Sequence, residues 1–220
     1  MGTGKIIIVE GPDGSGKGTI IEKIVSKYKT VVNYKFPCNT SKHESRKEII
    51  EKANAGTRQK DLIPLFVQNF LDVLPDIKKD HDDGKTVIID RMYVSTTVYG
   101  IEDIMKDGAT EEEIKERKSY ISNLLSPLSS FKPDLLIITQ VNAQSAHNRI
   151  TQRSSTTTNV DEKENSLDGD IAKKERINKL YLDYAIEHKA KGENIAIIDS
   201  NLPINEMIAN VEEALKEWIL

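Results

Sequence analysis

Five short apolar runs, each rich in β-branched residues, divide a chain that is otherwise strongly polar. Between these runs the apolar positions recur every three or four residues, which is the spacing of amphipathic helices. Strands that alternate with helices are typical of a parallel sheet with helices on both faces, and such a sheet binds ligands at the carboxyl ends of its strands. The pattern therefore predicts an α/β fold with a five-stranded parallel sheet, its strands at residues 6–9, 31–36, 86–89, 134–139 and 194–199.

The helices between these strands are predicted from their apolar stripes and capping residues. Pro64 suits the first turn of one helix, whereas Pro75 is expected to kink or interrupt that helix. Residues 154–159 are all polar and predict a loop. No internal repeat or interdomain linker is apparent, so residues 1–220 are interpreted as a single domain. Beyond the helix that follows Gly16, the expected helices span 41–55 with Ser41 as N-cap, 61–79, 92–105, 110–125, 142–152, 170–190 and 204–218.

The segment between the first strand and the first helix has the pattern of a phosphate-binding loop. Gly11, Gly16 and Lys17 fit G-x-x-x-x-G-K in the strand–loop–helix context that the motif requires. Backbone N–H groups and the helix dipole would bind phosphate oxygens, and Lys17 would add a full positive charge. A glycine-rich turn with a chance lysine fits the spacing and the context less well. We expect the phosphate groups of a bound ligand to contact Gly11, Pro12, Asp13, Gly14, Ser15, Gly16, Lys17, Gly18 and Thr19.

The loop departs from its usual form directly after Lys17. A Ser or Thr is expected there, because its hydroxyl reaches Mg²⁺, but this chain has Gly18 and places Thr19 one residue later. Mg²⁺ usually keeps several of its waters in protein sites. We therefore expect phosphate oxygens and water to provide most of the Mg²⁺ coordination, with Thr19 and Asp90 acting through water.

Asp90 and Arg91 follow a buried strand, so in a parallel sheet they share an edge with the phosphate loop. A carboxylate there can orient a nucleophile or hold Mg²⁺ through water. An arginine there can bind an acceptor phosphate through two hydrogen bonds. Taken alone, the two residues also fit a surface turn with a local ion pair. Their place beside a phosphate loop favours the functional interpretation.

Two further arginines lie one helical turn apart, at Arg149 and Arg153, just before the polar run. Arginines on a closing lid can neutralise the charge of a phosphoryl group in transfer. The alternative is a solvated basic face. We expect a short mobile lid at about residues 149–169.

Composition excludes several classes of function. The net charge of −4 disfavours a broad nucleic-acid-binding face. No apolar run approaches the ~18 residues of a membrane span, and the chain enters a strand at once instead of a signal peptide. The single cysteine, Cys38, excludes an internal disulfide and fits a reducing compartment. We therefore expect a cytoplasmic protein that binds neither nucleic acid nor a membrane.

Three of the four phenylalanines, Phe36, Phe66 and Phe70, are open to two interpretations. Their aromatic faces could stack on a nucleobase. Their positions also suit the hydrophobic core. The residues alone do not favour either role.

These motifs together resemble those of the thymidylate kinases, within the P-loop nucleoside monophosphate kinases. Residues 10–17, EGPDGSGK, are similar to that family's phosphate loop, including the acidic Asp13. The likeness covers nearly the whole chain. It implies a P-loop kinase fold and, from the family's habit, a homodimer. A segment similar to the family's D-R-x-x-x-S-x-x-x-Y pattern is formed by Asp90, Arg91, Ser95, Thr96 and Tyr99.

The resemblance also implies which residues face the acceptor. Lys35-Phe36-Pro37 is similar to the family's loop near the acceptor phosphate, and Phe66 lies where a phenylalanine stacks on the base. Catalytic roles are implied for Lys17, Asp13, Asp90, Arg91 and Arg153, with Arg149 assisting ATP binding. Substrate contacts are implied for Lys35, Phe36, Phe66, Asn69, Phe70, Arg91, Ser95, Thr96 and Tyr99.

Three positions depart from the family pattern. Gly18 follows the style of adenylate kinases. Phe70 stands where an arginine usually faces a thymine carbonyl, and Gly100 replaces a common glutamine. Specificity for thymine therefore does not follow from the resemblance.

The resemblance implies transfer of the γ-phosphoryl group of ATP, with Mg²⁺, to a deoxynucleoside 5′-monophosphate such as dTMP. Two alternatives stay open. One is a nucleotide kinase that uses polyphosphate as its donor, and the other is a non-catalytic regulatory protein that binds nucleotide.

Overall fold

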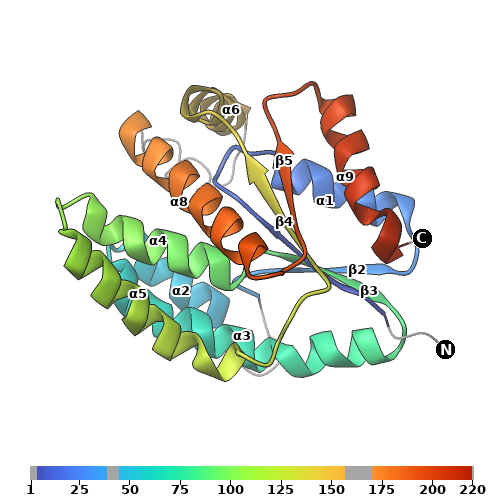
Figure 1. Ribbon diagram of the computed structural model, residues 1–220, viewed down its shortest axis with the longest axis horizontal. Helices are drawn as coiled ribbons and strands as arrows, with labels where there is room; N and C mark the ends of the chain where they lie inside the picture. Colours follow the sequence, from blue (N-terminus) through green and yellow to red (C-terminus); the bar gives the residue numbers. More distant parts are fainter. Residues whose placement is uncertain (1–3, 39–44, 157–169, 220) are drawn as a thin grey trace.

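The computed structural model places one parallel sheet between two layers of helices (Figure 1). The structure describes residues 4–38, 45–156 and 170–219. The strands pair side by side in the order β2-β3-β1-β4-β5, and every pair is parallel. This confirms the predicted fold class. The strands are β1 (Ile6–Glu10), β2 (Val31–Lys35), β3 (Thr86–Asp90), β4 (Leu135–Gln140) and β5 (Ile195–Asp199).

The helices lie in the connections between consecutive strands, except α9, which follows β5, and each helix lies close to its predicted position. Capping explains two of the boundaries: Thr110 and Asp170 each accept a hydrogen bond from a backbone N–H in the first turn that follows. The helices are α1 (Lys17–Lys27), α2 (Ser45–Asn54), α3 (Gln59–Asp82), α4 (Tyr93–Met105), α5 (Glu111–Leu125), the 3₁₀ turn η1 (Ser126–Leu128), α6 (Ala143–Thr156), α8 (Ile171–Ala190) and α9 (Ile204–Ile219).

Successive residues of each central strand point to opposite faces of the sheet, and this alternation builds two cores. Ile7 packs on one face in a cluster with side chains of α1 and α9. Ile8 packs on the other face with side chains of α3, α4 and α8. The strands are apolar on both faces because both faces are covered. Among the residues described, none of the helices is long and apolar enough to cross a membrane.

The predicted interruption of one helix at Pro75 and the predicted place of Pro64 in its first turn are wrong. α3 continues through Pro75, because the buried positions Phe70, Val73 and Ile77 form one stripe on both sides of the proline. Since α3 begins at Gln59, Pro64 lies in its second turn and not in its first.

The predicted polar loop also begins later than expected. Its first three residues, 154–156, form the last turn of α6. The remainder of that loop, the predicted N-cap Ser41 and the predicted lid residues 157–169 lie outside the described residues.

Candidate active site

The sheet brings the two predicted motifs together at one edge. β1 and β3 are neighbours, with Val9 opposite Asp90, and the Arg91 N–H donates to the Val9 carbonyl at 3.0 Å. The loop after β1 and the residues after β3 therefore leave the sheet side by side. This is the crevice in which parallel sheets bind their ligands.

Glycines allow the phosphate loop to lie close to β4 and α6. A Cβ on Gly11, at φ 141°, would lie 2.1 Å from Thr139 Oγ1. A Cβ on Gly14, at φ 78°, would lie 2.5 Å from the Ala146 carbonyl oxygen. A 2.6 Å hydrogen bond between the hydroxyls of Ser15 and Thr139 ties the loop to β4. The loop is thus held against the sheet with its backbone geometry set by glycine.

Lys17 is buried within this loop. Its ammonium group donates to the carbonyl oxygens of Gly11 at 2.7 Å and Pro12 at 2.8 Å. Burial and the nearby charge of Arg91 lower the pKa of Lys17 to about 7. A phosphate placed in the loop would offer this ammonium group a charged partner in place of two carbonyls.

Arg91 occupies a strained backbone position, at φ 67°, and no other non-glycine residue among those described has a positive φ. Its guanidinium group donates to Asp13 at 2.5 Å, to Ser95 Oγ at 3.0 Å and to the Tyr181 hydroxyl at 3.3 Å. It also lies 5.6 Å from the ring centroid of Tyr99. The side chain is therefore held on three sides, and its ion pair with Asp13 joins it to the phosphate loop.

Glu10, the last residue of β1, has a role that the sequence motifs do not predict. Its carboxylate is fully buried and accepts hydrogen bonds from the backbone N–H groups of Met92 and Ser95 at 2.7 and 3.2 Å, and from the Ser95 hydroxyl. Met92, the N-cap of α4, makes no side-chain cap of its own. The side chain of Glu10, at the end of β1, therefore caps the N-terminus of α4. Burial raises the pKa of Glu10 despite these bonds. The sequence signal for this buried carboxylate was a charged residue at the end of an otherwise apolar strand.

Glu10→Ala is expected to lower the free energy of unfolding by about 3 kcal/mol, because it leaves three buried donors without an acceptor. Glu10→Gln keeps one carbonyl oxygen for the two N–H groups, so its free energy of unfolding is expected to fall by less. Urea unfolding measures both changes. Glu22→Ala, at an exposed position on α1, is the matched control. Equal stabilities of the two alanine variants would contradict the capping role.

Asp90 is also buried at this edge, and its Oδ1 atom has no hydrogen-bond partner among the described residues. Its negative charge acts on Lys17 and opposes the lowering of that pKa. A buried carboxylate oxygen without a donor suits a bound cation or a water held by one. No cluster of three or more His, Cys, Asp or Glu side chains that could enclose a metal occurs in the described part of the chain.

The two predicted lid arginines have different surroundings. Arg149 donates to the Gly14 carbonyl at 3.2 Å and to the Ser200 carbonyl at 2.7 Å, so it joins the phosphate loop to the end of β5. Arg153 is exposed on α6, one turn further from that loop.

Several of the predicted substrate contacts lie in the core, where they make structural contacts. Phe36 and Phe70 are core residues, packed edge to face with their ring centroids 4.7 Å apart. Asn69 is fully buried and exchanges two hydrogen bonds of 2.8 Å with the Cys38 backbone. Phe66 packs against the core and is only partly buried.

The other predicted substrate contacts lie partly on the surface and partly in buried positions. Lys35 is exposed at the end of β2. Thr96 is buried, and its hydroxyl donates to the Met92 carbonyl at 3.2 Å. Tyr99 donates to Asp13 at 3.2 Å, which places its hydroxyl beside the phosphate loop. Gly100 lies where helices cross, because a Cβ there would lie 2.8 Å from Ile121 and 2.9 Å from Ile63.

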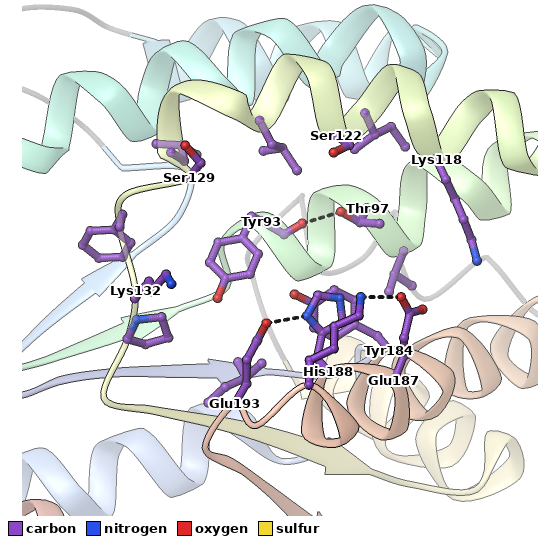
Figure 2. A pocket seen from close by; sticks show the side chains of 18 of the residues that line it. Tyr93, Thr97, Lys118, Ser122, Ser129, Lys132, Tyr184, Glu187, His188 and Glu193 are labelled. Atoms are coloured by element: carbon purple, nitrogen blue, oxygen red, sulfur yellow. Dashed lines mark hydrogen bonds and ion pairs between the residues drawn. The ribbon is translucent and has the colours of Figure 1, made fainter.

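A separate cavity of about 840 Å³ lies between α4, α5, η1 and the C-terminal half of α8 (Figure 2). Tyr93 and Tyr184 are among its lining residues. None of the site residues predicted from the sequence lines this cavity. The cavity therefore does not belong to the phosphate-binding edge.

The comparisons with known proteins agree with a phosphate-binding site at this edge of the sheet. A family model described as thymidylate kinase matches residues 9–211. A thymidylate kinase of Mycoplasmoides gallisepticum is 26% identical over 218 residues, which cover 96% of this chain and 93% of the relative.

Two solved structures share the fold. Thymidylate kinase from Candida albicans superposes with a TM-score of 0.72 at 21% identity, covering 98% of this chain and 92% of that chain. Deoxyadenosine kinase from M. mycoides, with bound dATP, superposes with a TM-score of 0.66 at 16% identity, covering 96% and 98%.

Proposed function

We propose, because the chain belongs to the thymidylate kinase family, that it transfers the γ-phosphoryl group of ATP to a deoxynucleoside 5′-monophosphate, and to dTMP most readily. It is a nucleoside monophosphate kinase. The observation that carries the proposal is the 2.5 Å ion pair between Asp13 and Arg91. This pair joins a donor-binding loop to an arginine at the neighbouring strand end, so that two phosphate groups can be held next to each other.

Lys17 and Arg91 would divide the phosphate groups between them. Lys17 would exchange its two carbonyl partners for the β- and γ-phosphates of ATP. Arg91 would bind the phosphate of the acceptor, and Asp13 would help to orient it. The acceptor phosphate is already an anion, so the reaction needs alignment and charge neutralisation more than a general base.

Mg²⁺ fits this site through Asp90, whose buried Oδ1 atom lacks a donor among the described residues. Asp90 and the Thr19 hydroxyl would hold it through water, since Gly18 offers no side chain. When bound, the ion would neutralise negative charge on the phosphates.

Arg149 supports the loop through Gly14, and we propose that it assists ATP binding. Arg153 is proposed to act on the transferring phosphoryl group. Phe66 would stack on the base, with Tyr99 beside the sugar. A homodimer and a cytoplasmic location stay predictions from the sequence.

A coupled assay of ADP release over a panel of nucleoside monophosphates tests the proposed function. We expect turnover with deoxynucleotides, highest with dTMP, and with ATP as the donor. Polyphosphate, tested in parallel, should not replace ATP. Turnover with polyphosphate alone would support the other kinase class. ATP binding without turnover of any monophosphate would support a regulatory protein, and the family comparison does not favour either alternative.

ATP binding is expected to take up protons at about pH 8. The Lys17 pKa of about 7 leaves this group mostly neutral there, and phosphate contacts favour its charged form. Calorimetry in two buffers of different ionisation enthalpy measures the protons taken up per ATP bound. Lys17→Met should abolish the uptake. The same heat in both buffers for the unaltered protein would contradict the lowered pKa.

A further inference from the structure

We propose that Tyr181 of α8 is a positioning residue that orients Arg91 toward the acceptor phosphate. The proposal rests on the proposed function, because it assumes that Arg91 binds that phosphate. It assigns a role to a side chain 90 positions away in the sequence, which neither the motifs nor the family comparison places in the site.

Arg91 needs support from outside its own segment. Its backbone lies in the left-handed region, and its guanidinium group has two ends with different partners. One terminal nitrogen, Nη2, donates to Asp13. The other, Nη1, donates to both Ser95 and Tyr181. Without the second set of acceptors, only Asp13 and the ring of Tyr99 would hold the guanidinium group.

The direction of the hydrogen bonds follows from the number of protons. The Ser95 hydroxyl has one proton and donates it to the Glu10 carboxylate. At the 2.8 Å contact between the two hydroxyls, Tyr181 must therefore donate to Ser95. The Tyr181 oxygen is left with its lone pairs for Arg91. Burial raises the pKa of Tyr181 well above its ordinary value, so the phenol keeps the proton that this arrangement needs.

This chain of bonds ends on Glu10, which also caps α4. The Tyr181 hydroxyl is thus fixed at both sides, and its ring is fully buried in the core. Figure 1 shows α8 running beside α4, and the two helices are in contact. A rigid helix packed against the site therefore holds the acceptor for the Arg91 side chain.

The same helix provides a matched control. Tyr184 lies three residues after Tyr181, and it lines the cavity of Figure 2, stacked on His188 at 3.9 Å. Within the described part of the chain its hydroxyl makes no hydrogen bond. Tyr184→Phe therefore removes a hydroxyl group from α8 without touching Arg91, whereas Tyr181→Phe removes the one that Arg91 uses.

The test compares binding of dTMP with binding of thymidine, which lacks the phosphate. We expect Tyr181→Phe to weaken dTMP binding about tenfold and to leave thymidine binding unchanged, because only the phosphate uses Arg91. The KM for ATP should not change. Tyr184→Phe should change the binding of neither dTMP nor thymidine. Equal weakening of dTMP and thymidine, or no change in either, would overturn the positioning role.

A double variant separates this proposal from the proposed function. Lysine lacks the forked donors of arginine, so in an Arg91→Lys background the Tyr181→Phe change should add less than about a twofold loss of dTMP binding. A full additional tenfold loss would show that Tyr181 acts elsewhere. If Arg91→Lys itself leaves dTMP binding unchanged, the acceptor site assigned to Arg91 fails, whatever the tyrosine variants do.

Discussion

Lys17→Met is expected to lower kcat by at least about 10³-fold, because the substitution removes the only full positive charge that the phosphate loop itself would place against the transferring group. The free energy of unfolding should not fall. The folded protein holds Lys17 at a pKa of about 7, against an ordinary value of 10.5, so the unfolded chain binds the proton more tightly. Lys17 therefore destabilises the folded protein at any pH below its ordinary pKa of 10.5. The cost in free energy of unfolding increases as the pH falls from 10.5 toward about 7. A neutral side chain of similar length removes this cost.

Steady-state kinetics and urea unfolding at neutral pH measure the two effects separately. Lys23→Met is the matched control, since Lys23 is exposed on the same helix and should tolerate the change in both measurements. A variant of Lys17 that unfolds more easily and loses activity in proportion would point to a structural role. Unchanged turnover with ATP and dTMP would remove Lys17 from the mechanism.

The elements that could be predicted are those whose own residues determine them. The run Thr86–Asp90 is buried on both faces and reads as a strand without reference to the remainder of the chain. The phosphate loop is similar, because its glycines are needed by the turn that contains them. Asp90 and Arg91 were placed beside this loop by a general property of parallel sheets. Their positions depend on strand order only through the pairing of β1 with β3.

The residues that were missed depend on how distant elements pack. Tyr181 shares an apolar stripe with Ile177, and both are core residues by pattern and by burial. Only the packing of α8 against α4 decides that a tyrosine hydroxyl meets Arg91 there. Phe70 and Asn69 are the opposite case, because they were predicted to contact a ligand and are buried in the core. Their contacts with Phe36 and Cys38 depend on which side of α3 packs against the residues that follow β2. Their residue types alone suited a ligand equally well.

Arg91→Ala and Arg91→Gly are expected to lose activity together but to differ in stability. Each removes the guanidinium group, so kcat/KM for the acceptor should fall by about 10³-fold or more in both. At φ 67° an alanine is strained and a glycine is not. Arg91→Gly should therefore be more stable than Arg91→Ala by roughly 0.5–1 kcal/mol, since relief of strain exceeds the greater chain entropy that glycine gives the unfolded state.

The same pair of substitutions at Lys23 should give the opposite order. Lys23 lies in the interior of α1, where glycine is less favourable than alanine by about 1 kcal/mol. Urea unfolding of all four variants measures both differences in one experiment. If glycine is less stable than alanine at both positions, the backbone at Arg91 is not strained in solution. If the order reverses only at Arg91, the left-handed conformation is present before any nucleotide binds. The arginine is then held in place by the fold and not by its substrate.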